Sequence, residues 1–468
     1  MNIILRKSLV AVILALLLGG CRFSGDDEAR RAAATPAPFH TDGRWIKDDQ
    51  GRVVILRGIN VGGGVKWDPW QYWYGEREWD LLMDWGMNVV RMLIIWEPIE
   101  PEPGQYTDWL FESGTDQLVA WSEERGINVI LDMHQDVYGP AVSGDGAAPW
   151  ATRTDIPFKH QEPWGINYLA RAVNESYDDL WTDPALQNHF IGAWLMAVQR
   201  YRYREIIIGY DLFNEPWPGT SAPWEFSRNR LGKFQDRVAQ AIRALDANRI
   251  IFYEPLTFTA AGMPANLPPP AVKGAGYAPH FYDPTLGFVH DQPYDLDPSR
   301  MNKVMDRYEK EARWMGNIPW LMGEFGVTNI APNWQVYLQD FYNALDAHMA
   351  SGTIWEYGKG SMGPLNPDGS EKTEFVNEIV RTYPQRIAGE PVSFGFDPAT
   401  RVFTLTYNIV EGVTGPTEIF IPEARHYPAG FRIVSADKNM KTEWDGRILK
   451  VWPDPDLTTF TIIIAPNS

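Results

Sequence analysis

Short apolar runs alternate with longer amphipathic segments from Gly43 to about Arg386. The short runs predict strands, and the longer segments, several with apolar residues at three- and four-residue spacing, predict helices. Eight runs fit strands, at residues 53–60, 88–95, 128–134, 205–214, 249–254, 275–280, 319–323 and 352–357. Between them lie helix-like intervals at 79–86, 116–125, 188–201, 234–245, 300–315 and 334–350.

The alternation of strand and helix is typical of parallel βαβ units. Eight strands are the number that closes a barrel with its helices outside. The pattern therefore predicts an α/β fold, a (β/α)8 TIM barrel, over residues 41–386.

The sequence pattern changes after Tyr383-Pro384. From there on, short β-like runs are separated by Gly, Pro and Asp, and no helical pattern is present. This pattern predicts a small antiparallel β-sandwich over residues 387–468. A structural role, packed against the barrel, is favoured for it over a carbohydrate-binding role.

The N-terminal residues resemble a bacterial lipoprotein leader. Arg6 and Lys7 precede an apolar run, residues 8–18, that is too short to span a bilayer. Leu18-Gly19-Gly20-Cys21 then resembles a lipobox. We expect residues 1–21 to be a signal peptide ending at a lipidated Cys21, with residues 22–40 as a flexible tether. The alternative is a chance cysteine after a plain signal peptide. The protein is therefore expected to be exported, and lipid-anchored to the bacterial cell envelope or secreted.

Charge and cysteine content narrow the possible partners. The formal net charge is −18, which argues against nucleic acid and against electrostatic adhesion to anionic lipid. Any attachment to a membrane would come from the lipid anchor. Because Cys21 is the only cysteine, the chain cannot form an internal disulfide and must rely on its apolar core. We expect a monomer without a cofactor, and the histidines show no metal-ligand spacing.

Two glutamates carry the clearest chemical signal. Glu215 lies in Phe213-Asn214-Glu215-Pro216-Trp217 and Glu324 in Leu321-Met322-Gly323-Glu324-Phe325-Gly326, each at the end of a predicted strand. In a parallel barrel these strand ends meet at one mouth. Two carboxylates about 5–5.5 Å apart cleave a glycosidic bond with retention at the anomeric carbon. The alternative is two ordinary charged residues at strand ends.

These motifs resemble glycoside hydrolase family five, and the resemblance implies that Glu215 is the acid/base and Glu324 the nucleophile. Residues 60–66 and 132–138 further resemble the endoglycoceramidases, which release an intact glycan from ceramide. That likeness includes residues 416–424, so it spans nearly all of the chain beyond the leader.

Further residues at strand ends complete the predicted site. Arg91 would keep Glu324 ionised, Tyr282 would donate to the same carboxylate, and His280 would support them. Asn214 is placed to bind the sugar 2-OH. The resemblance implies that the sugars are contacted by Lys66, His134, Asp136 and Trp164, with Trp355 as the platform under the ring at the cleavage site.

The leading hypothesis is thus a retaining endo-β-glycosidase that hydrolyses the glycan–ceramide linkage of glycosphingolipids. An endo-β-glucanase, similar to a cellulase, would share the carboxylates. A non-catalytic glycan-binding surface lipoprotein is a third possibility, although the presence of both glutamates disfavours it. Glu356 and Tyr357 depart from the endoglycoceramidase pattern after the platform residue, which affects the choice of glycan.

Overall fold

The computed structural model describes residues 38–287 and 289–467. The predicted signal peptide, Cys21 and nearly all of the predicted tether lie outside these residues. Within the described ranges, no helix combines the length and the apolar character needed to cross a membrane.

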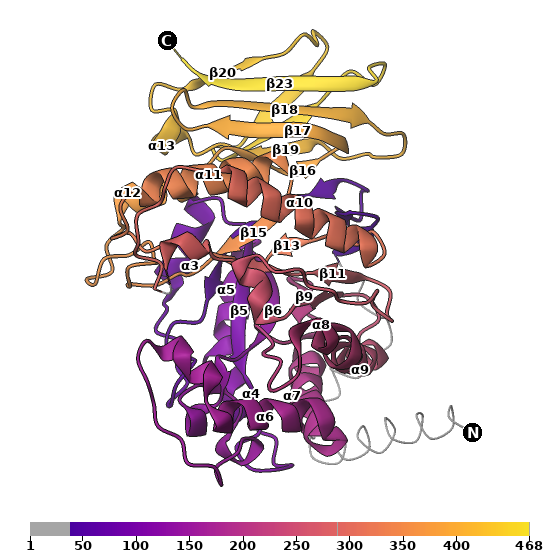
Figure 1. The fold of residues 1–468 in the computed structure, drawn as a ribbon. Coiled ribbons are helices and arrows are strands. Elements are labelled where there is room, and N and C mark those ends of the chain that lie inside the picture. Colours follow the sequence, from indigo (N-terminus) through magenta and orange to yellow (C-terminus); the bar gives the residue numbers. More distant parts are fainter. Residues whose placement is uncertain (1–37, 288, 468) are drawn as a thin grey trace.

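A closed parallel barrel forms the body of the molecule (Figure 1). Its sheet has the order β11-β10-β9-β6-β5-β4-β15-β13, and the two ends meet through a parallel bridge between Tyr277 and Trp320. Beyond that bridge, β12 (His280–Phe281) pairs with β14 (Glu324–Phe325). The strands are β4 (Arg57–Val61), β5 (Val89–Ile95), β6 (Asn128–His134), β9 (Ile207–Asp211), β10 (Ile250–Tyr253), β11 (Ala275–Tyr277), β13 (Leu321–Met322) and β15 (Ser351–Ile354). The predicted barrel is confirmed.

Helices surround this sheet and bury their apolar faces against it. The largest is α7 (Pro184–Tyr201), whose N-cap Asp183 accepts a hydrogen bond from the Ala185 amide. The others in the barrel are α3 (Glu76–Asp84), α4 (Trp96–Ile99), α5 (Asp116–Arg125), α6 (Arg171–Thr182), α8 (Pro223–Phe226), α9 (Gly232–Leu245), α10 (Ser299–Trp314), α11 (Trp334–Ala347) and α12 (Thr373–Ile379).

A hairpin of β1 (Phe39–Asp42) and β2 (Trp45–Asp48) covers the N-terminal end of the barrel. Phe39 and Ile46 from this hairpin share one buried cluster with Val89, Ile130 and Ile250, which stand near the starts of three barrel strands. The barrel is therefore open for chemistry only at its other end, where the strands finish.

The C-terminal residues form two antiparallel sheets at one end of the molecule (Figure 1). One has the order β1-β2-β3-β16-β19-β22-β21 and the other β17-β18-β23-β20, and β17 packs on α11. The new strands are β3 (Val53–Val54), β16 (Tyr383–Ile387), β17 (Gly389–Asp397), β18 (Val402–Ile409), β19 (Thr417–Phe420), β20 (Phe431–Val434), β21 (Lys441–Trp444), β22 (Ile448–Trp452) and β23 (Thr459–Pro466).

The antiparallel character predicted for this part is confirmed, with one correction. The sequence showed no helical signal after Tyr383, yet residues Glu423–His426 form one short helix, α13. It is a single turn that begins after Pro422, so it has no amphipathic period to detect. Three N-terminal strands also join the larger sheet, because Val53 pairs with Ile387. The domain boundaries drawn from the sequence stay predictions.

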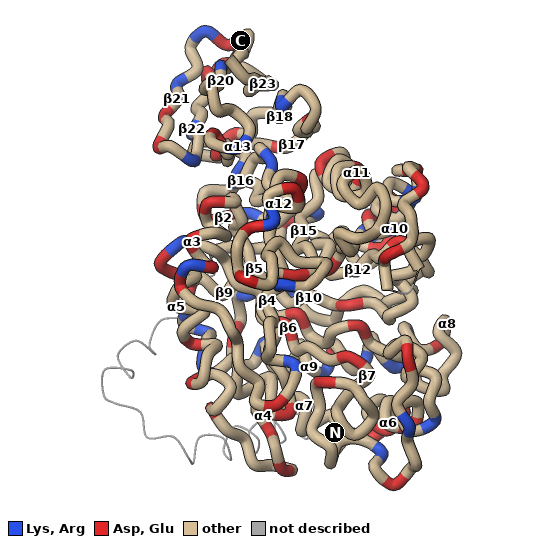
Figure 2. Tube along the Cα trace, turned by 90° about the vertical axis from the view of Figure 1, so that its left-hand side faces the viewer, with Lys and Arg blue, Asp and Glu red and all other residues tan. Residues whose placement is uncertain are grey.

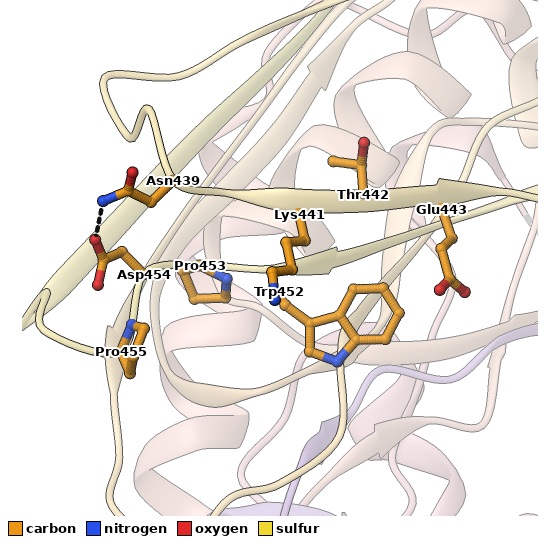
Figure 3. A pocket seen from close by; sticks show the side chains of 8 residues that line it. All are labelled: Asn439, Lys441, Thr442, Glu443, Trp452, Pro453, Asp454 and Pro455. Carbon is orange, nitrogen blue, oxygen red and sulfur yellow. Dashed lines mark hydrogen bonds between the residues drawn. The ribbon is translucent and has the colours of Figure 1, made fainter.

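Acidic and basic residues are scattered over the molecule (Figure 2). Acidic residues outnumber basic ones, 60 to 42 over the whole sequence. On the larger C-terminal sheet, β21 and β22 border a groove of about 870 Å³ (Figure 3). Lys441 stands opposite Trp452 in this groove. The groove lies in the sandwich and is separate from the site at the barrel mouth.

Candidate active site

Glu215 and Glu324 face each other at the barrel mouth. Glu215 follows β9, and Glu324 begins β14. His280 lies between them, with its Nδ1 atom 2.9 Å from Glu215 Oε1 and 3.7 Å from Glu324 Oε2. One carboxylate oxygen of each glutamate and a ring nitrogen of His280 all lie within 4.8 Å of one another. This short separation suits the retaining arrangement, in which no water needs to fit between the carboxylates.

Arg91 on β5 holds the floor of the site. Its side chain is fully buried, and Nη1 donates to Glu324 Oε1 at 2.9 Å. The same guanidinium contacts three more carboxylates, those of Asp132, Asp211 and Glu254, at 2.7–3.0 Å. Burial alone would lower the pKa of Arg91, but these carboxylates raise it well above its usual value. Arg91 is therefore a fixed positive charge beside Glu324.

Glu324 receives a second donor from the opposite side. The Tyr282 hydroxyl donates to Glu324 Oε2 at 2.9 Å, and the Tyr282 ring stacks on His290 with centroids 4.7 Å apart. Both carboxylate oxygens thus have a donor, one charged and one neutral. Such bonds fix the orientation of the carboxylate.

The backbone of Glu215 is held in the left-handed region, at φ 43°. Its amide donates to Glu254 Oε2 at 2.8 Å, and its carbonyl accepts from Thr257 Oγ1 at 2.7 Å and Gln135 Nε2 at 3.1 Å. An uncommon conformation of this kind persists where surrounding contacts over-determine it. Here it directs the carboxyl group toward His280.

Burial raises the pKa of Glu215, and this outweighs the lowering by His280. For His280 itself, burial acts to lower the pKa, but Glu254 and Glu324 raise it well above its usual value. The raised pKa of Glu215 suits this carboxyl group to carry a proton as a general acid.

A second charged cluster lies on one side of the mouth. Lys66 forms an ion pair with Asp136, and its Nζ atom lies 3.2 Å from Asp145 Oδ2. His134 Nδ1 is 2.8 Å from Asp132 Oδ2, and its Nε2 atom is 3.5 Å from Asp136. Burial raises the pKa of Asp145 to about 6. The cluster offers alternating donors and acceptors, as sugar hydroxyls require.

Trp355 packs against this cluster. Its ring stacks on His134 with centroids 5.6 Å apart and an interplanar angle of 12°, and Lys66 lies 5.5 Å from the ring centroid. Trp164 lies further out, 43% exposed, with its ring 6.1 Å from Tyr168. Glu356 is half-buried, and burial raises its pKa. The structure thus gathers Lys66, His134, Asp136 and Trp355 and leaves Trp164 at the rim.

Asn214 lies in the site with its amide partly engaged. Its Oδ1 atom accepts from Arg91 at 3.0 Å, and its Nδ2 atom donates to the Gln135 carbonyl at 2.9 Å. An amide NH₂ has two hydrogens, so one donor remains for a sugar hydroxyl.

Sequence reasoning missed Glu254, which follows β10. This carboxylate bridges Arg91, His280 and the Glu215 amide. The available signal was a charged residue at the end of the fifth predicted strand. Asp132 and Asp211 were also missed. The same kind of signal was available for both, because each ends or nearly ends an apolar run. Asp145, in the irregular loop after β6, had no such signal.

Three groups of side chains have metal-ligand spacing within the described residues: His134, Asp136 and Asp145; Glu215, His280 and Glu324; and Asp132, Asp211 and Glu254. The first contains the Lys66 ion pairs, and the third surrounds the Arg91 guanidinium. In both, a side-chain cation already stands among the carboxylates.

Residues 48–361 match the family model described as cellulase (glycosyl hydrolase family 5). Residues 381–464 match the model of the glycoside hydrolase family 5 C-terminal domain. The chain belongs to glycoside hydrolase family 5. As a family 5 member it is a glycoside hydrolase, which confirms the enzyme class predicted from the two glutamate motifs.

Within family 5, this chain is similar to endoglycoceramidase I of Rhodococcus hoagii (strain 103S), with 28% identity over 96% of this chain and 93% of that protein. The structure of endo-glycoceramidase II from Rhodococcus sp. in complex with ganglioside GM3 matches with a TM-score of 0.84 and 28% identity, over 91% of this chain and 100% of that one. Its lactosyl-enzyme intermediate matches with a TM-score of 0.81 and 28% identity, over the same shares. The predicted resemblance to endoglycoceramidases is confirmed.

Proposed function

We propose that this enzyme is a retaining endoglycoceramidase, which hydrolyses the bond between the glycan and ceramide of a glycosphingolipid. The observation that carries the proposal is the pair Glu215 and Glu324, held by His280 and Arg91 at the mouth of a barrel with endoglycoceramidase relatives along nearly its full length. The products are an intact reducing oligosaccharide and ceramide.

In the first step, Glu324 attacks the anomeric carbon as a carboxylate. The glycosidic C–O bond breaks, a glycosyl–Glu324 ester forms, and Glu215 gives its proton to the departing ceramide oxygen. Arg91 and Tyr282 hold Glu324 oriented before attack. The raised pKa of Glu215 keeps the proton available.

In the second step, Glu215 is a carboxylate and accepts a proton from water. The water oxygen bonds to the anomeric carbon, and Glu324 leaves as a carboxylate. Two inversions give net retention. Asn214, whose oxygen is held by Arg91, is placed to donate to the sugar 2-OH as positive charge develops on the ring.

The two sides of the mouth differ in charge. Lys66, His134, Asp136 and Asp145 lie on one side. The loops after β10 and β14 carry no Asp, Glu, Lys or Arg over residues 255–272 and 326–333. The charged cluster suits a glycan, and the two uncharged loops suit the alkyl chains of ceramide, although the loop between them carries Asp283, Asp291, Asp295 and Asp297. This asymmetry supports a glycolipid over a polysaccharide, which would need sugar-binding groups on both sides.

We further propose that the enzyme is exported and attached to the cell envelope by a lipid on Cys21. The sequence alone supports this: a short apolar run, Gly19-Gly20 and then the only cysteine. The acidic body would not itself adhere to anionic lipid. An anchor would keep the active site close to substrates that reside in a membrane.

The decisive assay compares purified glycosphingolipids with soluble β-glucans and uses mass spectrometry to identify both released halves. Endoglycoceramidase activity yields a whole oligosaccharide and ceramide in a 1:1 ratio. Cleavage of β-glucan with none of the glycolipids would instead support the endo-β-glucanase alternative, which shares the same carboxylates. Absence of any hydrolysis would leave only a glycan-binding role.

A further inference from the structure

Exposed apolar side chains gather at one end of the barrel. Leu169, Trp224, Met263, Leu296 and Ile330 are 73%, 69%, 45%, 54% and 69% exposed, respectively. Each lies in a different segment that follows the end of a barrel strand: Leu169 after β6, Trp224 in α8 after β9, Met263 after β10, Leu296 after β12 and Ile330 after β14. These five residues are referred to below as the apolar rim.

The loops that carry the apolar rim are joined side by side. Tyr168 stacks on Trp217 with centroids 4.7 Å apart, and Thr257 donates to the Glu215 carbonyl at 2.7 Å. Further along, the Tyr282 amide donates to Ala260 at 3.0 Å, and the Thr328 amide to His290 at 3.3 Å. The five loops therefore form one continuous border around half of the mouth.

The opposite end of the barrel is different. Among the exposed large apolar side chains of the barrel's described residues, only Trp314 lies there, at the end of α10 just before β13. Soluble proteins scatter single exposed apolar residues, whereas a group of them on one face marks a contact surface. Exposed apolar side chains are therefore concentrated at the mouth end of the barrel.

We propose that the apolar rim is a docking surface for a lipid bilayer with zwitterionic head groups. Trp, Leu, Ile and Met side chains on neighbouring loops enter the interface between head groups and acyl chains, as amphipathic membrane-binding segments do. A net charge of −18 disfavours an anionic surface. The geometry points the active site at the bilayer, with the uncharged loops after β10 and β14 facing lipid.

This inference rests on the proposed function, because docking brings the mouth to a membrane-resident glycolipid. The rim lies beyond Glu215 and Glu324, so a soluble substrate would reach the glutamates without it. Loss of the rim therefore slows turnover of glycolipid in vesicles and leaves turnover of a soluble aryl glycoside unchanged.

The single cysteine allows a position-specific test. In the full chain carrying Cys21→Ser, Ile330→Cys and Trp224→Cys are labelled separately with a nitrobenzoxadiazole fluorophore, and Trp314→Cys, a site of similar exposure, is the matched control. Phosphatidylcholine vesicles without glycolipid are then added. Emission should increase and shift to shorter wavelength at positions 330 and 224 and stay unchanged at 314. No shift at 330 and 224, or an equal shift at 314, overturns the proposal.

A kinetic arm uses Trp224→Asp with Leu296→Asp, both outside the two loops proposed to face ceramide, against Trp314→Asp. The rim variant should lose at least roughly tenfold in kcat/KM on glycolipid in vesicles, because burying either side chain in lipid is worth about that factor or more. Its rate on a soluble aryl glycoside should equal wild type. If vesicles shift the probe but no glycolipid is cleaved in any form, the proposed function fails and docking stands. Cleavage in detergent without a probe shift means that docking alone fails.

Discussion

At the scale of single residues, the site depends on one buried arginine. Arg91 touches four carboxylates, yet only Glu324 among them also faces Tyr282. Burial raises the pKa of Asp211 well above its usual value, although the Arg91 guanidinium acts to lower it. Arg91 and Tyr282 together fix the orientation of Glu324, where the nucleophile is needed.

The two glutamates should fail in different ways when changed. Glu324→Gln should lower kcat by about 10⁴-fold or more on every substrate while leaving glycolipid binding intact, because no covalent intermediate can form. Glu215→Ala should slow natural glycolipids about 10²–10⁴-fold but aryl glycosides with good leaving groups much less, since these need no proton. Steady-state kinetics on both substrate types tests this. Equal losses for Glu215→Ala would contradict its role as the acid.

His134 should make stability depend on pH. Burial and Lys66 lower the pKa of His134, but Asp132 and Asp136 outweigh them and raise it from 6.5 to about 9. Because the folded chain binds this proton more tightly, the stabilisation is fully present below pH 6.5 and is lost as pH rises through about 9. Urea unfolding should show a decrease on the order of 3 kcal/mol over that window. His134→Asn should remove this decrease in the free energy of unfolding. If the variant loses as much stability over the same pH range, His134 is not its source.

The sequence located Glu215 and Glu324 because each sits in a motif at the end of a recognisable strand. It did not locate Glu254, since a lone carboxylate at a strand end is usually a surface or structural residue. Its role arises only when β10 closes beside β9 and brings Glu254 to the Glu215 amide. Such contacts depend on the register of the whole barrel, which local patterns do not specify.

At the scale of elements, Gly86 joins the barrel to the sandwich. It has φ 74° in the turn after α3, and its carbonyl accepts from the Tyr383 hydroxyl at 2.6 Å. A Cβ atom on Gly86 would lie 2.3 Å from Cε1 of Phe420, on β19. The sandwich therefore packs on the barrel through a contact that only glycine allows.

Gly86→Ala should destabilise the protein more than Gly126→Ala, a matched control. Gly126 also has a positive φ, 64°, but a Cβ atom there would meet nothing within 4 Å. Both alanines suffer left-handed strain of about 1–2 kcal/mol. Gly86→Ala adds the clash with Phe420, worth about 1–3 kcal/mol. Urea unfolding measures the difference. Equal decreases in the free energy of unfolding for the two variants would mean that the interface accommodates the new Cβ atom without a penalty.

The elements differ in how well the sequence predicted them. Strand Asn128–His134 and helix Asp116–Arg125 match to the residue, because the strand is a continuous buried run and Gly126 ends the helix in the left-handed region. Helix Arg171–Thr182 was missed, since its N-cap is Ala170, without a capping side chain, and its buried face includes Ser176. A helix without a capping residue at its start and with a polar residue on its buried face is hard to recognise from the sequence.

At the scale of the whole molecule, the barrel with its C-terminal antiparallel domain was predictable from alternation of strand and helix. The joining of β3 to β16 was not. β3 begins at Val53 and β16 at Tyr383, and pairing over that distance along the chain leaves no local trace in the sequence. The N-terminal hairpin thus both plugs the barrel and extends the sandwich.

Attachment to a membrane should depend on Cys21, which lies outside the described residues. Cys21→Ser should leave the thermal unfolding midpoint unchanged and should move the protein from the membrane to the soluble fraction, because one acyl-modified cysteine is then lost. Fractionation after a high-salt wash measures this. An unmodified Cys21 thiol in the wild type, found by mass spectrometry of the N-terminal peptide, would contradict a lipid attached at this residue, whereas weak residual pelleting of the variant would reflect docking through the apolar rim.

The central claim is retaining cleavage of the glycan–ceramide bond by Glu215 and Glu324. Proton NMR during hydrolysis of a β-linked glycosphingolipid in detergent tests it most directly, because the anomeric signal of the first product appears before mutarotation. We predict an intact oligosaccharide released first as its β anomer, with ceramide in equal amount, from the wild type and not from Glu324→Gln. An α anomer as the first product, or a monosaccharide released ahead of the oligosaccharide, would contradict the account.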